Sequence, residues 1–208
     1  MIGDKAKENL NADPDRVEVI IYGAINILQT INAVLWVIIL GWLTGTLYES
    51  IVLSTSASIL RKYSGGGHAS SPMRCAIIGA GISVSGGLLV NKFGVYADYR
   101  LILLCIVFSA IVSLIIIMKK APVDSIEKPI DDENLKKIFR NKSIATIFVF
   151  LSISIMLLLI GQRYLEKFNI ITLESIMLGI LWQGFTLTKS GIYFINKVDK
   201  ILKLISLR

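Results

Sequence analysis

The sequence contains a single histidine, His68, and only two cysteines, Cys75 and Cys105, among its 208 residues. A lone histidine cannot join a second one at a zinc site, so we expect no metal and no other cofactor. Cys105 lies inside the apolar run LILLCIVFSAIVSLIII, and two cysteines placed in this way do not form a disulfide framework. Disulfide-stapled and zinc-stabilised small domains are therefore excluded.

Charge is also scarce, at 18% of residues against 54% hydrophobic, and the mean hydropathy is +0.68. The charges gather in a few clusters between long uncharged runs, which is typical of a polytopic integral membrane protein of the all-α class. The net charge of +7 could suggest a nucleic-acid partner. However, the basic residues flank the apolar runs, so membrane topology and the lipid bilayer explain them and we expect no nucleic acid.

The uncharged runs predict about six membrane-embedded helices in a single domain covering residues 1–208. Residues 1–16 are polar, and a helix is expected to begin near Pro14. The first apolar run is too long for a cleavable signal peptide, and Gly41 and Gly45 allow it to break before a second, weaker segment that carries Glu49. The predicted segments are 19–43, 44–60, 75–91, 101–118, 143–162 and 168–188. The first two could instead be interfacial helices, which leaves four firm spans.

Lysine and arginine predict the orientation of these spans. They number 3 before the first span, 3 in 61–74, 7 in 119–142 and 5 after residue 188, whereas the other two breaks hold 2 each. The positive-inside rule then places both termini, the 61–74 stretch and the hydrophilic 119–142 loop in the cytoplasm. Pro122 and Pro129 should separate this loop from the preceding helix. The 75–91 run has small residues at helical spacing, which predicts close helix packing.

The stretch from Arg61 to Cys75, RKYSGGGHASSPMRC, holds the histidine and one cysteine. Imidazole can accept the proton of a thiol, but seven positions along an unbroken helix would separate the two by roughly 10 Å. The glycines at 65–67 permit a turn, and Ser71-Pro72 is typical of a helix start, so we expect His68 on a loop and Cys75 in the first turn of a helix. The helix dipole and the neighbouring Arg74 would both favour the thiolate. Cys105 has no such neighbours and is interpreted as structural.

These residues, together with APVDSIEKPI at 121–130, resemble the accessory gene regulator B (AgrB) family, the membrane cysteine endopeptidases of peptide quorum sensing. The resemblance extends over nearly the whole chain. It implies that His68 and Cys75 are catalytic and that the substrate is a short AgrD-type precursor peptide, cut at its C-terminal side. It further implies the cell membrane of a Gram-positive bacterium, with the site toward the cytoplasm, and is compatible with a homodimer.

In such a peptidase, a Cys75 thioester would be resolved by a cysteine or serine of the bound peptide to give a thiolactone or lactone. Basic side chains near the pair could attract the acidic tail of the peptide, and backbone N–H groups could stabilise the oxyanion. The candidate substrate-binding residues are Arg61, Lys62, Gly65, Gly66, Gly67 and Arg74, and the N–H groups of 72–75 are further donors. The alternative is a non-enzymatic transporter or scaffold with a glycine-rich hinge at 65–67, in which Cys75 would be dispensable.

Overall fold

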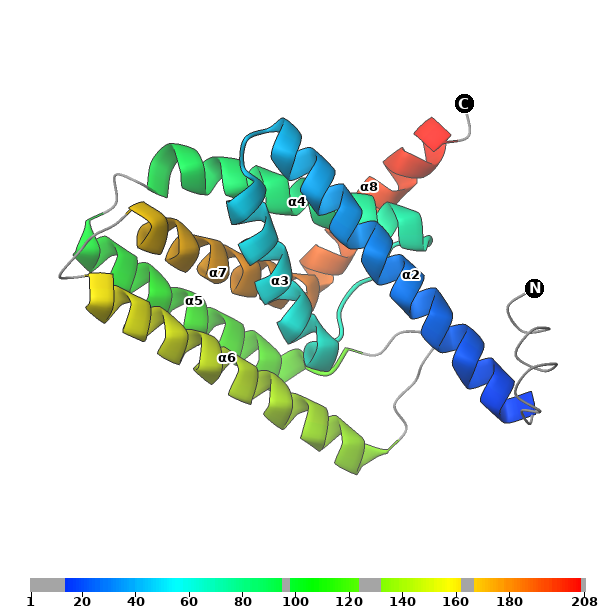
Figure 1. Cartoon of the computed structure of the whole chain (residues 1–208). Coiled ribbons are helices and arrows are strands. Elements are labelled where there is room, and N and C mark those ends of the chain that lie inside the picture. Colours follow the sequence, from blue (N-terminus) through cyan, green and yellow to red (C-terminus); the bar gives the residue numbers. More distant parts are fainter. Residues whose placement is uncertain (1–13, 95–97, 124–131, 162–166, 207–208) are drawn as a thin grey trace.

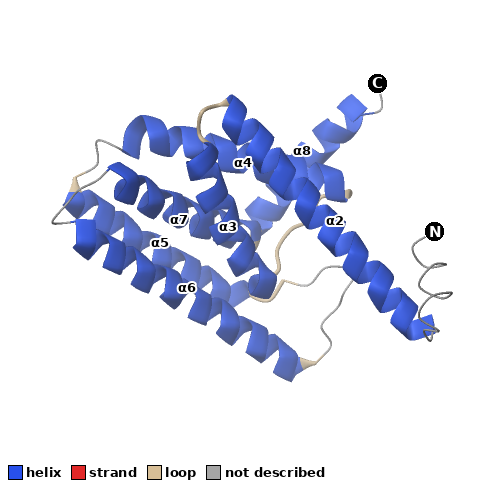
Figure 2. Ribbon diagram, in the orientation of Figure 1, coloured by secondary structure: helices blue, strands red, loops and turns tan. Residues whose placement is uncertain are grey.

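The computed structural model describes residues 14–94, 98–123, 132–161 and 167–206, and every regular element in these ranges is a helix (Figures 1 and 2). The helices are α2 (Pro14–Leu43), α3 (Leu47–Ser64), α4 (Pro72–Phe93), α5 (Tyr99–Lys120), α6 (Glu133–Gly161), α7 (Lys167–Thr186) and α8 (Lys189–Ser206). Five of them, namely α2, α4, α5, α6 and α7, are long and apolar enough to cross a membrane. The prediction of an all-α, multi-pass membrane protein is confirmed.

The sixth predicted segment, α3, is more polar than those five but lies at the centre of the bundle, packed against α2, α4, α6 and α7 (Figure 1). Its polar side chains are satisfied within the protein: buried Glu49 accepts a hydrogen bond of 2.8 Å from Asn91 Nδ2, and Ser56 Oγ donates to the Val52 carbonyl at 2.7 Å. Because neighbouring helices cover α3, it can be polar without exposing these groups to lipid. This central position shows that α3 packs against several helices of the bundle.

The helix pair α2 and α3 forms a hairpin whose turn spans Thr44 to Thr46. Gly45 has φ +69° there, a left-handed conformation that suits glycine, so the predicted break lies at Gly45. Gly41 stays inside α2, where a side chain would crowd the Leu47 backbone. The 30 residues of α2 extend about 45 Å, and its N-terminal half reaches beyond the other helices in Figure 1.

Small side chains bring α4 close to α3, as the sequence predicts. Ala76, Ala80, Ser83 and Gly87 are all buried, and a Cβ at Gly87 would lie 2.9 Å from Ser50 Oγ. Gly79 belongs to the same sequence pattern, yet a Cβ there would meet nothing within 4 Å. The close helix contact therefore runs along one face of α4 that excludes Gly79.

The connection between α5 and α6 is shorter than the predicted 119–142 loop. Helix α5 ends at Lys120, before Pro122, as expected, but α6 begins at Glu133 and not at residue 143. The polar residues 133–142 form the first turns of α6, because a helix can extend past the apolar part of its sequence; Arg140 Nε there donates to the Ala121 carbonyl at 2.9 Å. Pro129 and most of the predicted turn at 163–167 lie outside the described residues.

Helix α8 is absent from the sequence prediction, which uses the residues after 188 only for their lysines and arginine. The helix is amphipathic and contacts both α4 and α7. Its buried side carries Ile195 and Asp199, whereas Tyr193 and Leu204 are exposed. It brings the C-terminal part of the chain against the N-terminal end of α4.

Candidate functional site

The glycine loop between α3 and α4 is held at the C-terminal end of α7. Gly65 and Gly66 have φ values of +68° and +135°, which side chains rarely adopt. The Gly67 N–H donates to the Thr186 carbonyl at 3.1 Å. Gln183, which is only 1% exposed, donates through Nε2 to the Gly65 carbonyl at 2.7 Å and to Ser64 Oγ at 2.9 Å. These contacts fix the loop against α7.

The loop also meets the beginning of the 121–130 stretch. Val123 forms an isolated parallel bridge with Gly65, and its N–H donates to the Ser64 carbonyl at 2.9 Å. A Cβ at Gly65 would overlap the Val123 carbonyl oxygen. The two stretches that carry the family resemblance, far apart in sequence, are therefore in contact.

His68 and Cys75 lie in the local structures that the sequence predicts. His68 is exposed on the loop, and Cys75 is partly buried in the first turn of α4, where its N–H donates to the Ser71 carbonyl at 2.9 Å. Ser71 is the N-cap residue, with extended backbone, and Pro72 is the first helical residue, although the Ser71 side chain makes no capping hydrogen bond. Cys105 lies in α5 and is exposed on the outer surface of the bundle, not buried.

Arg61, at the end of α3, is brought near both residues. Its Nη2 donates to the Gly67 carbonyl and lies 3.3 Å from His68 Nδ1. Burial lowers the pKa of the Arg61 guanidinium, and electrostatic attraction to Cys75 opposes that shift. A guanidinium remains protonated in proteins and can only donate, so Nδ1 of His68 must be unprotonated when it accepts this contact. Such a histidine is neutral, and its one basic nitrogen is the Nδ1 that faces Arg61.

The position of Arg74 beside Cys75 in the sequence suggests a free cation next to the thiol. In the structure, however, the Arg74 guanidinium is bound by other residues. Its Nε donates to Asp199 Oδ1 of α8 at 2.6 Å, and its Nη2 donates to Ser70 Oγ at 2.7 Å. Burial would raise the pKa of Asp199, but hydrogen bonds from Ser70 and Arg74 and the charge of Arg74 outweigh it and hold that pKa below its usual value. Sequence reasoning missed Asp199. The periodicity after residue 188 could have revealed α8, but no sequence signal pairs Asp199 with Arg74.

The other predicted binding residues are distributed around this loop. Lys62 is exposed, with Nζ 5.6 Å from the centre of the Tyr63 ring. The backbone N–H groups of Gly65, Gly67 and Cys75 are engaged with carbonyls of the protein itself. The first-turn N–H groups of Met73 and Arg74, which cannot bond to a preceding helical carbonyl, are better placed to serve an incoming oxyanion. Across the described residues, no three His, Cys, Asp or Glu side chains gather closely enough to hold a metal ion.

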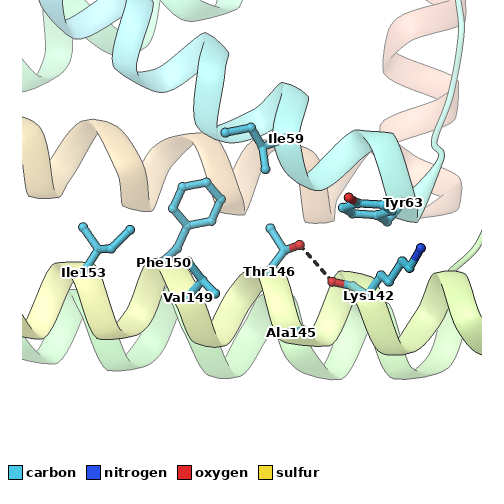
Figure 3. A pocket seen from close by; sticks show the side chains of 8 residues that line it. All are labelled: Ile59, Tyr63, Lys142, Ala145, Thr146, Val149, Phe150 and Ile153. Carbon is cyan, nitrogen blue, oxygen red and sulfur yellow. Dashed lines mark hydrogen bonds between the residues drawn. The ribbon is translucent and has the colours of Figure 1, made fainter.

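An open groove of about 430 Å³ lies between α3 and α6, with Tyr63 and Lys142 at one end (Figure 3). Its lining is mostly apolar: Ile59, Tyr63, Lys142, Ala145, Thr146, Val149, Phe150 and Ile153. Tyr63 follows Arg61 by two residues, so the two project from nearly opposite sides of α3. The groove is therefore separate from the surroundings of His68 and Cys75.

Comparisons with known proteins agree with the resemblance. The sequence model of Accessory gene regulator B matches residues 1–187. The AgrB-like protein of Clostridium perfringens strain SM101 is 32% identical over 200 residues, which cover 96% of this chain and 94% of the relative. AgrB-like protein 2 of C. perfringens strain 13 is 31% identical with the same coverage. No solved structure matches the chain. The extent of these matches shows that the chain belongs to the accessory gene regulator B (AgrB) family.

Proposed function

We propose that the chain is a membrane-embedded cysteine endopeptidase that cleaves the C-terminal part from an AgrD-type precursor peptide and promotes cyclisation of the remainder. Membership of the AgrB family supports a role in accessory-gene-regulator quorum sensing. The cysteine chemistry, the catalytic pair and the cyclic product are the finer parts of the proposal.

The observation that carries this proposal is the position of Arg61. One guanidinium contacts His68 Nδ1 at 3.3 Å and interacts electrostatically with Cys75. The only histidine of the chain and one of its two thiols thus share a cation, although seven residues separate them. That cation lies between the candidate base and the candidate nucleophile. A base able to take the thiol proton and a site that stabilises the resulting anion are what nucleophilic catalysis by cysteine requires.

In the proposed reaction, Arg61 releases His68 Nδ1, this nitrogen accepts the Cys75 proton, and the sulfur attacks the scissile carbonyl. The tetrahedral intermediate collapses to a Cys75 thioester, and the histidine returns its proton to the departing amine of the C-terminal fragment. A thiol or hydroxyl of the bound peptide then attacks the thioester, which frees Cys75 and closes a thiolactone or lactone. Backbone N–H groups at Met73 and Arg74 serve the oxyanion in this scheme.

The substrate side of the site involves the remaining candidates. Arg61 and Lys62 attract the acidic tail of the precursor, and the site faces the cytoplasm, where the peptide is made. Support for the orientation comes from the excess of Lys and Arg in the breaks at 61–74, 119–142 and after 188. Arg74 is less suited to contact substrate because Asp199 already holds it.

The proposal is tested by following release of the C-terminal fragment from the precursor in membranes that contain Cys75→Ala, His68→Ala or the matched control Cys105→Ala. We expect both Cys75→Ala and His68→Ala to abolish release and Cys105→Ala to retain it, since Cys105 is exposed on α5, which carries none of the candidate site residues. Normal processing by Cys75→Ala or His68→Ala, in protein that is inserted at wild-type levels, would refute the peptidase and favour a transporter or scaffold.

A further inference from the structure

We propose that Asp199 of α8 is a positioning residue of the site, which fixes the segment between His68 and Cys75 by binding Ser70 and Arg74 together. The inference rests on the proposed peptidase function, because it assigns a role in that chemistry to a residue that acts through Ser70 and Arg74.

The contacts of Asp199 form a closed network. Oδ2 accepts from the Ser70 N–H at 3.1 Å and from Ser70 Oγ at 2.5 Å, and Oδ1 accepts from Arg74 Nε at 2.6 Å. Arg74 Nη2 closes the network by donating to Ser70 Oγ at 2.7 Å. Asp199 is only 6% exposed, and hydrogen bonds to charged groups in such surroundings are short and directional.

The network holds the segment that connects His68 and Cys75, the two candidate catalytic residues. Ser70 is two residues after His68, and Arg74 is adjacent to Cys75 in the first turn of α4. One carboxylate therefore holds the chain on both sides of the Ser71-Pro72 helix start. Because small displacements of reacting groups reduce rates strongly, an anchor at this point should control the approach of His68 to Cys75.

Packing of α8 reinforces the same anchor. A Cβ at Gly67 would lie 3.2 Å from Ile195 Cδ1 and 3.3 Å from Ile192 Cγ1, so α8 rests directly on the residue that precedes His68. The match to the family model covers residues 1–187 and stops before α8 begins. The anchor thus comes from a part of the chain that this family match does not include.

The network also gives Arg74 a positioning role in place of the substrate-binding role that the sequence suggests. Two nitrogens of its guanidinium, Nε and Nη2, already donate to Asp199 and Ser70. Loss of Arg74 should therefore mimic loss of Asp199, and removing both should cost little more than removing either one. If Arg74 bound substrate independently, the two losses would add.

The test compares Asp199→Asn, Asp199→Glu, Arg74→Gln and the Asp199→Asn/Arg74→Gln double variant in a Cys105→Ala background. Glu133→Gln is the matched control, since it removes an exposed carboxylate at the start of α6. Two quantities are measured: kcat and KM for the precursor, and the rate at which iodoacetamide alkylates Cys75 without substrate.

We expect Asp199→Asn to lower kcat by about 10- to 100-fold with little change in KM, and to change the alkylation rate severalfold. Arg74→Gln and the double variant should match it, Asp199→Glu should recover part of kcat, and Glu133→Gln should leave all values unchanged.

Unchanged kcat and alkylation in Asp199→Asn, or additive effects of the two substitutions, would overturn the positioning role. The alkylation assay needs no peptidase activity, so it judges the anchor even if Cys75→Ala still processes the precursor. If Asp199→Asn fails to fold, Arg74→Gln decides alone: unchanged alkylation in that variant contradicts the proposal.

Discussion

Gly65 is required by two separate constraints at the residue scale. Its φ of +68° is unfavourable for any other residue type, and a Cβ would overlap the Val123 carbonyl. The contact joins the end of α3 to the residues that follow α5, so a shift there would also move the loop that carries His68.

We therefore predict that Gly65→Ala destabilises the protein by about 1–3 kcal/mol or more and impairs precursor processing. The matched control is Gly79→Ala, because a Cβ at Gly79 meets nothing within 4 Å and α4 is helical there. That control should be neutral or more stable by up to ~1 kcal/mol. Thermal unfolding in detergent micelles measures both, and equal stability of the two variants would contradict the steric argument.

Residue identity and spacing were sufficient to predict where His68 and Cys75 lie, because glycines, a serine and a proline determine the loop and the helix start locally. They were insufficient for Asp199, whose partners Ser70 and Arg74 are 129 and 125 positions away. Arg61 was expected near the site, but its contact with His68 depends on how the glycine loop folds back onto α3. Contacts of this kind are set by tertiary packing and leave no local pattern.

Among the elements, α8 is the one that the sequence analysis overlooked. Long uncharged runs predict helices that face lipid, whereas α8 is amphipathic and carries several lysines, so no such run reveals it. For the same reason, the predicted segment at 143–162 begins later than α6, because the first turns of this helix are polar. In contrast, the small-residue face of α4 was predictable, because close packing needs small side chains at helical spacing.

Docking of α8 should depend on pH through Asp199, which faces Ser70 of the loop and Arg74 of α4. Its pKa is held below the usual value, so its ionised form stabilises the folded state above the unfolded pKa of about 3.9, and this contribution is lost as pH falls through the folded pKa. We predict that the wild type unfolds at a higher temperature than Asp199→Asn, by a steady margin from about pH 5 to 8, and that the margin shrinks below about pH 4. A margin that widens on acidification would show that the carboxylate does not stabilise the docked helix.

At the scale of the whole molecule, three segments that are distant in sequence lie at one end of the bundle. The loop at 65–71 contacts Val123, which follows α5, and also contacts Thr186 and Asp199. The positive-inside rule predicts that the basic breaks share one side of the membrane, and these contacts are consistent with that grouping.

We predict that single cysteines introduced at Lys62 and Glu133, in a background without Cys75 and Cys105, react with a membrane-impermeant maleimide only from the cytoplasmic side. A cysteine at Asp98, between α4 and α5, should react only from outside and serves as the opposite control. Labelling of position 133 from outside would reverse the proposed orientation of the site.

Formation of a thioester at Cys75 is the central claim, and intact-mass spectrometry of the purified Cys105→Ala protein tests it most directly. The substrate is a precursor peptide whose ring-closing cysteine or serine is replaced by alanine, so that the acyl-enzyme cannot resolve by cyclisation. We predict a protein mass increased by that of the retained N-terminal part of the peptide less one water; hydroxylamine should remove the adduct, and Cys75→Ala should not form it. Release of the C-terminal fragment without any adduct, or an adduct that persists in Cys75→Ala, would contradict covalent catalysis by Cys75.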